Sequence, residues 1–499
     1  MEYVIGCDVG SQGTKAILLS TEGEFSGESY EGYPIDYPHP LWAEQPVERW
    51  IDALTRAVRR LLFENGIHPD DVRALSLATQ VDGVVSIDAS GRALHPAIIW
   101  MDRRAGEQCE PVRDHLGEKQ IFQLTGLNLD ATHVAPKIRW LADHHPEMYR
   151  KAAYFLLPGS FMAYVLTNEL GIDYSNASST LLMDVRTKTW SEVMINAFDL
   201  DTSRLVPIRA ATASLGTLDP IQADKLGLRS STVVMVGCGD EHAACLGAGV
   251  TRPGIIADIA GTAEPVCAAS AEVAFDSTRL VETHCHADPD LWLLENPGFV
   301  SGGNYRWLRD QFARGETYAV LDVEALGVPP GAEGLTFLPC LMGAMAPTWN
   351  EAARGTYAGF TLAHTRGHFV RALLEGSAYA VRDITTQMQS AGIELSELRV
   401  VGGGAKSRLW NQIKADVTGL QVKVPEITET TALGAAFLAL VGLGAYATLT
   451  EASEYIVKIR ECIDPDPQTQ STYTESYERY RQTYFALLPL FEQAARRTA

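Results

Sequence analysis

Positive charge is scarce in this chain of 499 residues, where 41 Lys and Arg stand against 62 Asp and Glu and leave a formal charge of −21. A protein that binds DNA or RNA needs basic patches for the phosphates, so this balance argues against a nucleic-acid partner. A single nucleotide is not excluded, because a few backbone N–H groups can hold phosphates inside an acidic protein. The hydrophobic fraction of 46% excludes a disordered chain.

Closely spaced cysteine pairs are also lacking. No two of the eight cysteines stand in a C-x-x-C arrangement, which argues against a zinc ribbon or a thioredoxin-type site. We expect them to be buried free thiols of a reducing compartment. The start of the chain has no basic segment before an apolar run, so we find no secretion signal and expect a cytoplasmic protein.

One stretch, residues 430–450, lacks charged residues over a length that could span a membrane. It is rich in Ala and Gly, and its flanks are acidic instead of basic. We therefore predict a tightly packed internal helix, in which Gly434 and Ala435 allow close approach of a neighbour, and no membrane partner.

Strand-like and helix-like runs alternate along the chain, which is typical of an α/β protein. The strand-like runs are residues 3–8, 14–19, 74–79, 83–88, 233–237, 254–259, 265–269 and 398–401. Helix-like patterns cover residues 47–64, the stretch after 404 to about 418, and the tail at 472–497.

The two halves of the chain repeat one arrangement. A strand, a turn (DVGSQGT or IAGTAEP) and a second strand are followed later by a strand, a glycine turn and a helix (GCGDEHAAC at 237–245, GGGAKSRLW at 402–410). This predicts a duplicated α/β fold whose hairpins meet across a cleft. We expect a first domain at 1–250, a second at 251–445 and a helical extension at 446–499.

The first glycine-rich turn carries polar groups suited to a phosphate. Its glycines permit positive φ and close backbone approach. The candidate ligands are Gly10, Ser11, Thr14 and Lys15. Asp8, at the end of the preceding strand, could orient Mg²⁺ through water. The spacing is not that of a Walker A loop, and an ordinary β-hairpin would also fit these residues.

Two turns in the second half suit the rest of a nucleotide. Gly261 and Thr262 stand in the turn that repeats the first hairpin, and two facing hairpins can hold a polyphosphate from both sides. The run Gly402, Gly403, Gly404 and Ala405 follows a strand and opens a helix, as in nucleotide sites. A plain strand-to-helix turn fits the same run, and Ser407 replaces the last glycine of a dinucleotide fingerprint.

Asp240 follows a strand and a glycine turn. It could be a helix N-cap, which is a common use of Asp. It could equally be a carboxylate that opens into the cleft and accepts the proton of an attacking hydroxyl.

Polar clusters at two strand ends suit a polyol or fit ordinary surface loops. They contain Gln80, Val81, Asp82, Trp100, Asp102 and Arg103. The run His284-Cys285-His286 could suggest a metal, but no other ligand cluster stands near it in the sequence, so we predict no metal there.

With these residues in hand, the chain resembles the FGGY carbohydrate kinases of the actin-like ATPase superfamily over residues 3–445. The resemblance is carried by DVGSQGTKA, by the K-x-x-W segment that begins at Lys137, by the segment from Gly355 to Glu375, and by the glycines that start at Gly402. Within the family, residues 133–158 resemble the xylulokinases.

The resemblance implies two actin-like, ribonuclease H-like domains with the active site in the cleft between them. It implies Asp240 as the catalytic base, and Asp8 with Asp240 at Mg²⁺. The hairpins with Gly10, Ser11, Thr14, Lys15, Gly261 and Thr262 would hold the phosphates of ATP, and the run from Gly402 to Ala405 the adenosine. The sugar pocket would comprise Gln80, Val81, Asp82, Trp100, Asp102, Arg103, Asp240 and Glu241.

The implied reaction is phosphorylation of a small ketose, D-xylulose first. Val81-Asp82 replaces the Met-His pair of typical xylulokinases, which exchanges an imidazole for an acceptor carboxylate and leaves other ketopentoses or polyols open. A non-catalytic sugar-binding regulator of the same fold would be expected to lose phosphate or base positions, and none is lost here. Homodimers are common in the family.

Overall fold

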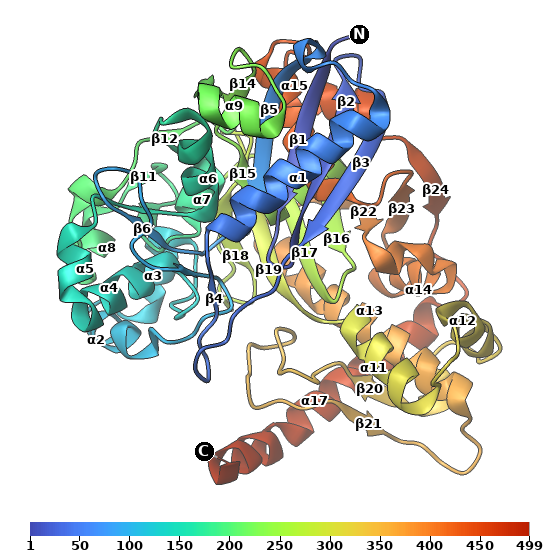
Figure 1. The fold of residues 1–499 in the computed structure, drawn as a ribbon. Coiled ribbons are helices and arrows are strands. Elements are labelled where there is room, and N and C mark those ends of the chain that lie inside the picture. Colours follow the sequence, from blue (N-terminus) through green and yellow to red (C-terminus); the bar gives the residue numbers. More distant parts are fainter. Residues whose placement is uncertain (499) are drawn as a thin grey trace.

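The computed structural model describes residues 1–498, and two large mixed β-sheets organise them (Figure 1). The first sheet has the order β13-β14-β5-β1-β2-β3, with β15 beside β5. Its strands are β1 (Tyr3–Val9), β2 (Gly13–Ser20), β3 (Phe25–Gly32), β5 (Val72–Thr79), β13 (Ser214–Thr217), β14 (Val233–Met235) and β15 (Cys238–Gly239).

The second sheet has the order β18-β19-β17-β16-β22-β23-β24. Its strands are β16 (Gly254–Ile259), β17 (Ala263–Ser270), β18 (Glu282–Cys285), β19 (Trp292–Val300), β22 (Leu395–Val401), β23 (Gln421–Pro425) and β24 (Ile459–Ile463).

The two sheets repeat one pattern of pairing. In the first, β1–β2 and β2–β3 are antiparallel, whereas β1–β5 and β5–β14 are parallel. In the second, β16–β17 and β17–β19 are antiparallel, whereas β16–β22 and β22–β23 are parallel. The predicted duplication is confirmed, and the two units are ribonuclease H-like domains of the actin-like ATPase fold.

Two helices cross between the halves. The helix α10 (Asp240–Ala248) packs Cys245 and Ala248 against strands of the second sheet, whereas α15 (Thr430–Gly442) packs on β1 and β5 of the first (Figure 1). A Cβ on Gly434 would lie 1.9 Å from the carbonyl oxygen of Ala243, so glycine is required where α10 and α15 touch. The predicted internal helix is therefore confirmed, but it ends at Gly442. None of the described helices is long and apolar enough to cross a membrane.

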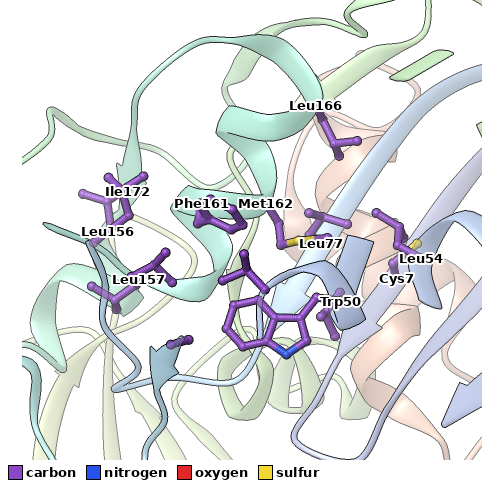
Figure 2. Packing of buried hydrophobic residues seen from close by; sticks show 14 of the residues in the cluster. Cys7, Trp50, Leu54, Leu77, Leu156, Leu157, Phe161, Met162, Leu166 and Ile172 are labelled. Atoms are coloured by element: carbon purple, nitrogen blue, oxygen red, sulfur yellow. The ribbon is translucent and has the colours of Figure 1, made fainter. Parts of the chain in front are cut away.

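An apolar core joins the first sheet to its outer helices. Figure 2 shows Trp50 of α1 (Glu48–Asn65) facing Leu77 of β5 and Phe161 and Met162 of α6 (Pro158–Thr167). The other helices of the first half are α2 (Gly106–Leu116), α3 (Glu118–Thr125), α4 (Val134–His144), α5 (Pro146–Lys151), α7 (Tyr174–Ser178), α8 (Glu192–Ala197) and α9 (Pro220–Leu226).

Short strand pairs lie outside the two large sheets. They are formed by β4 (Glu44–Gln45) with β7 (Ala97–Ile98), β6 (Val85–Ile87) with β8 (Tyr154–Leu156), β9 (Ile172–Asp173) with β12 (Ile208–Arg209), β10 (Met183–Asp184) with β11 (Thr189–Trp190), and β20 (Thr336–Leu338) with β21 (Thr356–Ala358). The strand expected at 83–88 is thus the short β6, outside the main sheet.

The second half carries the helices α11 (Gly302–Phe312), α12 (Tyr318–Leu326), α13 (Arg366–Ser390), α14 (Arg408–Thr418), α16 (Leu449–Ile456) and α17 (Gln470–Thr498). The tail helix is confirmed, and Tyr473, Tyr480 and Tyr484 on it are fully buried. The extension expected to be helical also contributes β24 to the second sheet. Cys462 on β24 is exposed, so the expectation that all eight cysteines are buried is wrong for this one.

Candidate active site

A cavity of about 520 Å³ opens between the second hairpin and the glycine turn after β22. This volume is typical of pockets that hold small molecules and cofactors. Gly261 and Thr262 reach it from the β16–β17 turn, and Gly403 and Gly404 reach it from a short 3-10 helix. The structure therefore brings together residues that lie about 140 positions apart in the sequence.

The backbone of this turn requires glycine. Gly402 has a φ of +77°, which favours glycine. The N–H of Gly404 donates to the carbonyl of Ala260 at 2.8 Å, and a Cβ on Gly404 would lie 2.5 Å from the Cβ of Ala260. Ala405 is buried beneath the turn. Gly402 and Ala405 thus shape the turn, whereas Gly403 and Gly404 face the cavity.

Several residues of the cavity wall were missed by the sequence analysis, namely Tyr305, Arg306, Tyr318, Asp322 and Trp410. The hydroxyl of Tyr305 donates to the carboxylate of Asp322 at 2.7 Å, and Arg306 donates to the hydroxyl of Thr262 at 2.8 Å. These residues come from α11, α12 and α14, and no motif recognised in the sequence points to their role. Only the fold brings them to the cavity.

The first hairpin presents a carboxylate with an unused oxygen. Asp8 lies near the end of β1, and its Oδ1 is shielded from solvent without a hydrogen bond. Burial raises the pKa of Asp8 to about 7; the charge of Lys15 opposes this shift, and that of Glu429 adds to it. An unpartnered carboxylate oxygen suits a hard cation such as Mg²⁺, so the residues present fit the ion that the resemblance implies.

Backbone contacts fix the turn beside Asp8. The N–H of Gly10 donates to the carbonyl of Gly13 at 3.0 Å, and the hydroxyl of Tyr33 donates to the carbonyl of Gly10 at 2.5 Å. Thr14 is fully buried behind the turn, whereas Ser11 is half-buried at its edge. The predicted phosphate residues are therefore neighbours, but Thr14 does not face solvent.

The segment before α15 connects the halves of the site. Lys15 Nζ of the first hairpin donates to Glu429 Oε2 at 2.8 Å. One residue earlier, the carbonyl of Thr428 accepts from the N–H of Gly402 at 3.0 Å. Since the glycine turn rests on the second hairpin, both hairpins and the glycine turn converge around this segment.

Asp240 is the first residue of α10, directly after β15. Gly239 is the N-cap and no side chain caps this helix, so Asp240 is not the N-cap that its position also allowed. Its Oδ1 accepts from the N–H of Glu241 at 3.0 Å. Burial raises the pKa of Asp240 well above its ordinary value, and the charges of Glu241 and Asp8 raise it further. A carboxylate of raised proton affinity is the type of group that acts as a general base.

Ser11 joins the first hairpin to two predicted sugar-pocket residues. Its hydroxyl donates to Gln80 Oε1 at 3.4 Å and accepts from Trp100 Nε1 at 2.7 Å. Gln45 of β4, which was not predicted, donates to the carbonyl of Ser11 at 2.7 Å and accepts from Gln80 at 3.0 Å. These bonds set Gln80 and Trp100 beside the phosphate turn.

Asp82 faces an imidazole. Its Oδ2 lies 3.3 Å from Nδ1 of His133, and its Oδ1 is buried without a partner. Burial alone would lower the pKa of His133, but the charge of Asp82 and a hydrogen bond to it outweigh this effect. The pKa rises to about 9, so the ring is protonated at neutral pH. Lys137 Nζ donates to the backbone carbonyl of Asp82 at 2.6 Å. Val81 packs on Gly239, where an added Cβ would come within 2.7 Å of Val81 Cγ1.

Asp102 is bound away from the predicted sugar pocket, and Arg103 contacts two carboxylates. The fully buried carboxylate of Asp102 accepts from Arg104 at 2.7 Å and from the N–H of Ala43 at 2.6 Å. These bonds, with others from Arg104, give Asp102 a structural role and correct its expected place in the sugar pocket. Arg103 binds Asp130 at 3.0 Å and Glu351 at 3.3 Å, and so ties the first half to the second.

Glu241 pairs with another carboxyl group. It interacts with Glu295 of β19, and burial raises the pKa of both carboxyl groups. The charge of Glu241 raises the pKa of Glu295 further, because neighbouring carboxylates disfavour each other's ionisation. Glu295 carried no signal in the sequence, because it lies in a strand without a motif.

Two ribonuclease H-like domains with these hairpins and carboxylates define a phosphotransferase of the actin-like ATPase class. Models of the FGGY family of carbohydrate kinases match residues 3–247 for the N-terminal domain and 257–443 for the C-terminal domain. The chain belongs to the FGGY family of carbohydrate kinases. It is a phosphotransferase with an alcohol group as acceptor, and sugar kinases of this family use ATP, generally with Mg²⁺.

Relatives with assigned activities are similar over nearly the whole chain. A xylulose kinase of Escherichia coli K12 is 31% identical and aligns over 97% of this chain and 99% of its own length. A glycerol kinase of Halorhodospira halophila is 32% identical over 89% of each chain. The crystal structure of a xylulose kinase from Rhodospirillum rubrum has a TM-score of 0.91 and 28% identity, and covers 98% of this chain and 100% of its own.

Proposed function

We propose that the chain transfers the γ-phosphate of ATP to a hydroxyl of D-xylulose, giving D-xylulose 5-phosphate. The observation that carries this proposal is the partly buried Asp240 carboxylate, which interacts with Asp8 near the place where the two hairpins and the glycine turn converge. Xylulose kinases are among the relatives that align over nearly the whole chain, which supports the choice of sugar.

The nucleotide occupies the glycine-lined cavity in this proposal. Gly403 and Gly404 lie against the adenosine, with Gly402 and Ala405 fixing the turn. The phosphates are held between the hairpins by Gly10, Ser11, Thr14, Lys15, Gly261 and Thr262. Asp8 and Asp240 are the residues that would hold Mg²⁺, which supplies positive charge to the transferred phosphate.

Asp240 acts as the general base. Its raised proton affinity lets it accept the proton of the sugar hydroxyl as that oxygen attacks phosphorus. The first half holds most of the sugar and the second half holds the adenosine, so closure of the domains brings hydroxyl and phosphate together and excludes water as a competing acceptor. The Arg103–Glu351 ion pair joins the two halves, so its geometry would change on closure.

The sugar is held by Gln80, Val81, Asp82, Trp100, Arg103 and Glu241. Trp100 is 43% exposed, which leaves part of its indole free to cover an apolar face of the sugar. His133 supplies an imidazolium beside Asp82, which compensates for the histidine that typical xylulokinases carry in the Val81-Asp82 position. A donor and an acceptor are thus both present near the sugar hydroxyls.

A second acceptor class has one specific observation in its favour. The glycerol kinase relative is as similar as the xylulose kinases, and Val81-Asp82 departs from the xylulokinase pattern. We therefore retain glycerol, ribulose, L-xylulose and erythritol as competing acceptors.

The use of ATP and the unpaired cysteines favour a cytoplasmic protein. The homodimer that the resemblance implies stays a prediction, which sedimentation would test.

The test is ADP release from Mg-ATP with a panel of D-xylulose, L-xylulose, D- and L-ribulose, D-fructose, glycerol, erythritol and gluconate. The proposal predicts the highest kcat/KM with D-xylulose. A higher value with glycerol or another polyol would replace D-xylulose and leave the kinase in place. ATP binding without turnover on any acceptor would favour a sugar-binding regulator.

A further inference from the structure

Three potential metal ligands from distant parts of the chain meet next to the site. They are His242 of α10, His284 of β18 and Glu295 of β19, and all three are buried. One donor atom from each lies within 4.8 Å of the donors of the other two. The rings of His242 and His284 stand edge to face, with centroids 5.6 Å apart. His284 belongs to the His-Cys-His run, near which the sequence shows no further metal ligands.

The donor atoms of this cluster are unused. Neither ring nitrogen of His242 makes a hydrogen bond, nor does Nδ1 of His284 or Oε2 of Glu295. Buried polar atoms without partners are costly, and several of them gathered in one cluster point to a bound ligand. His286, two residues along the chain, shows the contrast: its Nε2 contacts the carbonyl of Val250 at 2.9 Å, and its Nδ1 accepts from the N–H of Asp288 at 2.9 Å.

The charges around the cluster favour a cation. Glu282 and Glu295 lie across from each other on β18 and β19, each about 4 Å from Nε2 of His284. Within the described side chains, neither glutamate has an ion-pair contact with a lysine or an arginine.

We infer that His242, His284 and Glu295 form a second metal site, for a divalent cation of the zinc type. Two imidazoles and a carboxylate are a ligand set that prefers Zn²⁺, Co²⁺ or similar ions to Mg²⁺. Donors around tetrahedral Zn²⁺ lie roughly 3.3 Å apart, because each is about 2.0–2.2 Å from the metal. The three donors lie within 4.8 Å of one another, so they must approach by up to about 1.5 Å on binding, and Glu241 or Glu282 can supply a fourth ligand.

The site bridges the two halves of the protein. His242 lies in the segment that matches the N-terminal family domain, whereas His284 and Glu295 lie in the segment that matches the C-terminal one. A bound ion therefore holds the halves together. Glu241, a residue of the proposed sugar pocket, lies beside this site and links it to the pocket. The site is separate from the Mg²⁺ residues, of which Asp240 stands two positions before His242.

The test is direct binding of Zn²⁺ or Co²⁺ to the full-length protein from which a chelator has removed bound metal. Millimolar Mg²⁺ is present to occupy sites made of oxygen ligands alone. Zn²⁺ bound after gel filtration is counted by elemental analysis, and Co²⁺ is followed by its visible absorption. We expect one ion per chain, with a Co²⁺ spectrum of four-coordinate form. His284→Gln and the nearly isosteric Glu295→Gln should each weaken binding at least about 10-fold.

His286→Gln is the matched control, since His286 is buried on the same segment and both its nitrogens are satisfied. It should bind Zn²⁺ like the unaltered protein. Zn²⁺ should also raise the unfolding temperature of the unaltered protein and of His286→Gln, but not that of Glu295→Gln. Absence of bound Zn²⁺ in the unaltered protein, or binding that His284→Gln and Glu295→Gln leave unchanged, overturns the proposal.

Discussion

The two hairpins of the duplicated fold use one position in opposite ways. Asp8 of β1 and Asp258 of β16 are equivalent, because each precedes the last residue of its strand and pairs with the corresponding parallel strand, at Ala78 and Val400. Asp258 is fully buried with Glu264, and Lys414 donates to both. Oδ1 is without a partner in both aspartates, so the difference lies in the lysine that donates to Oδ2 of Asp258.

This difference separates chemistry from shape. The first half brings the carboxylates of Asp8 and Asp240 to the site, whereas the second half binds its equivalent carboxylate with Lys414. The second half also lines the cavity with glycine backbone and with side chains such as Arg306 and Asp322. A repeated fold can thus keep its architecture while one copy supplies charge and the other supplies a surface for the nucleotide. Five predictions test this division, from the largest expected effect to the smallest.

Asp240→Asn removes the proposed base and keeps its shape. We expect kcat to fall by about 10²–10⁴-fold, because an amide cannot accept the sugar proton. ATP affinity should change little, since the second half is proposed to bind the adenosine. Steady-state kinetics and calorimetric ATP titration measure the two effects. Near-normal turnover would remove Asp240 from this role and blur the division between the halves.

Lys414→Met tests the closed carboxylates of the second half. It leaves Asp258 and Glu264 buried together without a cation, so the free energy of unfolding should fall by about 3–5 kcal/mol. Part of the loss should be recovered as the pH falls, because the buried pair then takes up protons. Denaturant unfolding between pH 5 and 8 measures this.

Asp8→Asn is the counterpart of Lys414→Met in the first half. It removes a carboxylate whose buried oxygen is unpartnered, so stability should be unchanged or higher while activity falls. A loss of stability comparable to that of Lys414→Met would mean that the two aspartates are structurally alike.

The His133–Asp82 pair gives the first half a pH-dependent stability. Asp82 raises the pKa of His133 from 6.5 to about 9. The stabilisation of the folded state by this pair is therefore complete below pH 6.5 and is lost as the pH rises through 9. The pair contributes at most about 3 kcal/mol to the free energy of unfolding. Unfolding measured from pH 6 to 10 should show this loss, and Asp82→Asn should reduce it. An equal loss in Asp82→Asn would assign it to other groups.

Gly404→Ala tests the shape of the second half. The added Cβ would meet Ala260 at 2.5 Å, so the turn must shift. Overpacking of this size costs about 1–3 kcal/mol, and we expect it mainly as a 5- to 100-fold rise in the KM for ATP, with kcat less affected. Gly106→Ala, where a Cβ meets nothing, is the control. A change in the KM for sugar alone would contradict the division.

The sequence predicted turns and strand ends better than partners. Gly261, Thr262, Gly403 and Gly404 were predicted from the glycine turns in which they stand, and they share one cavity. In the second of these turns, Gly402 has a positive φ and Gly404 approaches Ala260 closely. Asp102 was misplaced, because a carboxylate near a strand end looks the same whether it binds a ligand or, as here, Arg104. Chemistry alone does not distinguish these uses.

Other residues could not be predicted, because their role depends on contacts between remote segments. Gln45, Tyr305 and Asp322 carry no motif, and they reach the site from separate elements of the fold. The equivalence of Asp8 and Asp258 was likewise hidden, since the pairing of strands had to be known first. The duplicated architecture itself was predictable, because both copies keep the strand–turn–strand pattern.

The exchange of α10 and α15 between the halves has a consequence for synthesis. One face of the first sheet is covered by residues 430–442, although its strand β1 begins at residue 3. While the chain emerges from the ribosome, that apolar face stays open until nearly the last helix is made. Pairing of segments so far apart is slow and leaves the nascent chain prone to aggregation. The first half is therefore not a unit that finishes folding on its own, and a fragment ending near residue 250 should need a chaperone or a supplied second half to stay in solution.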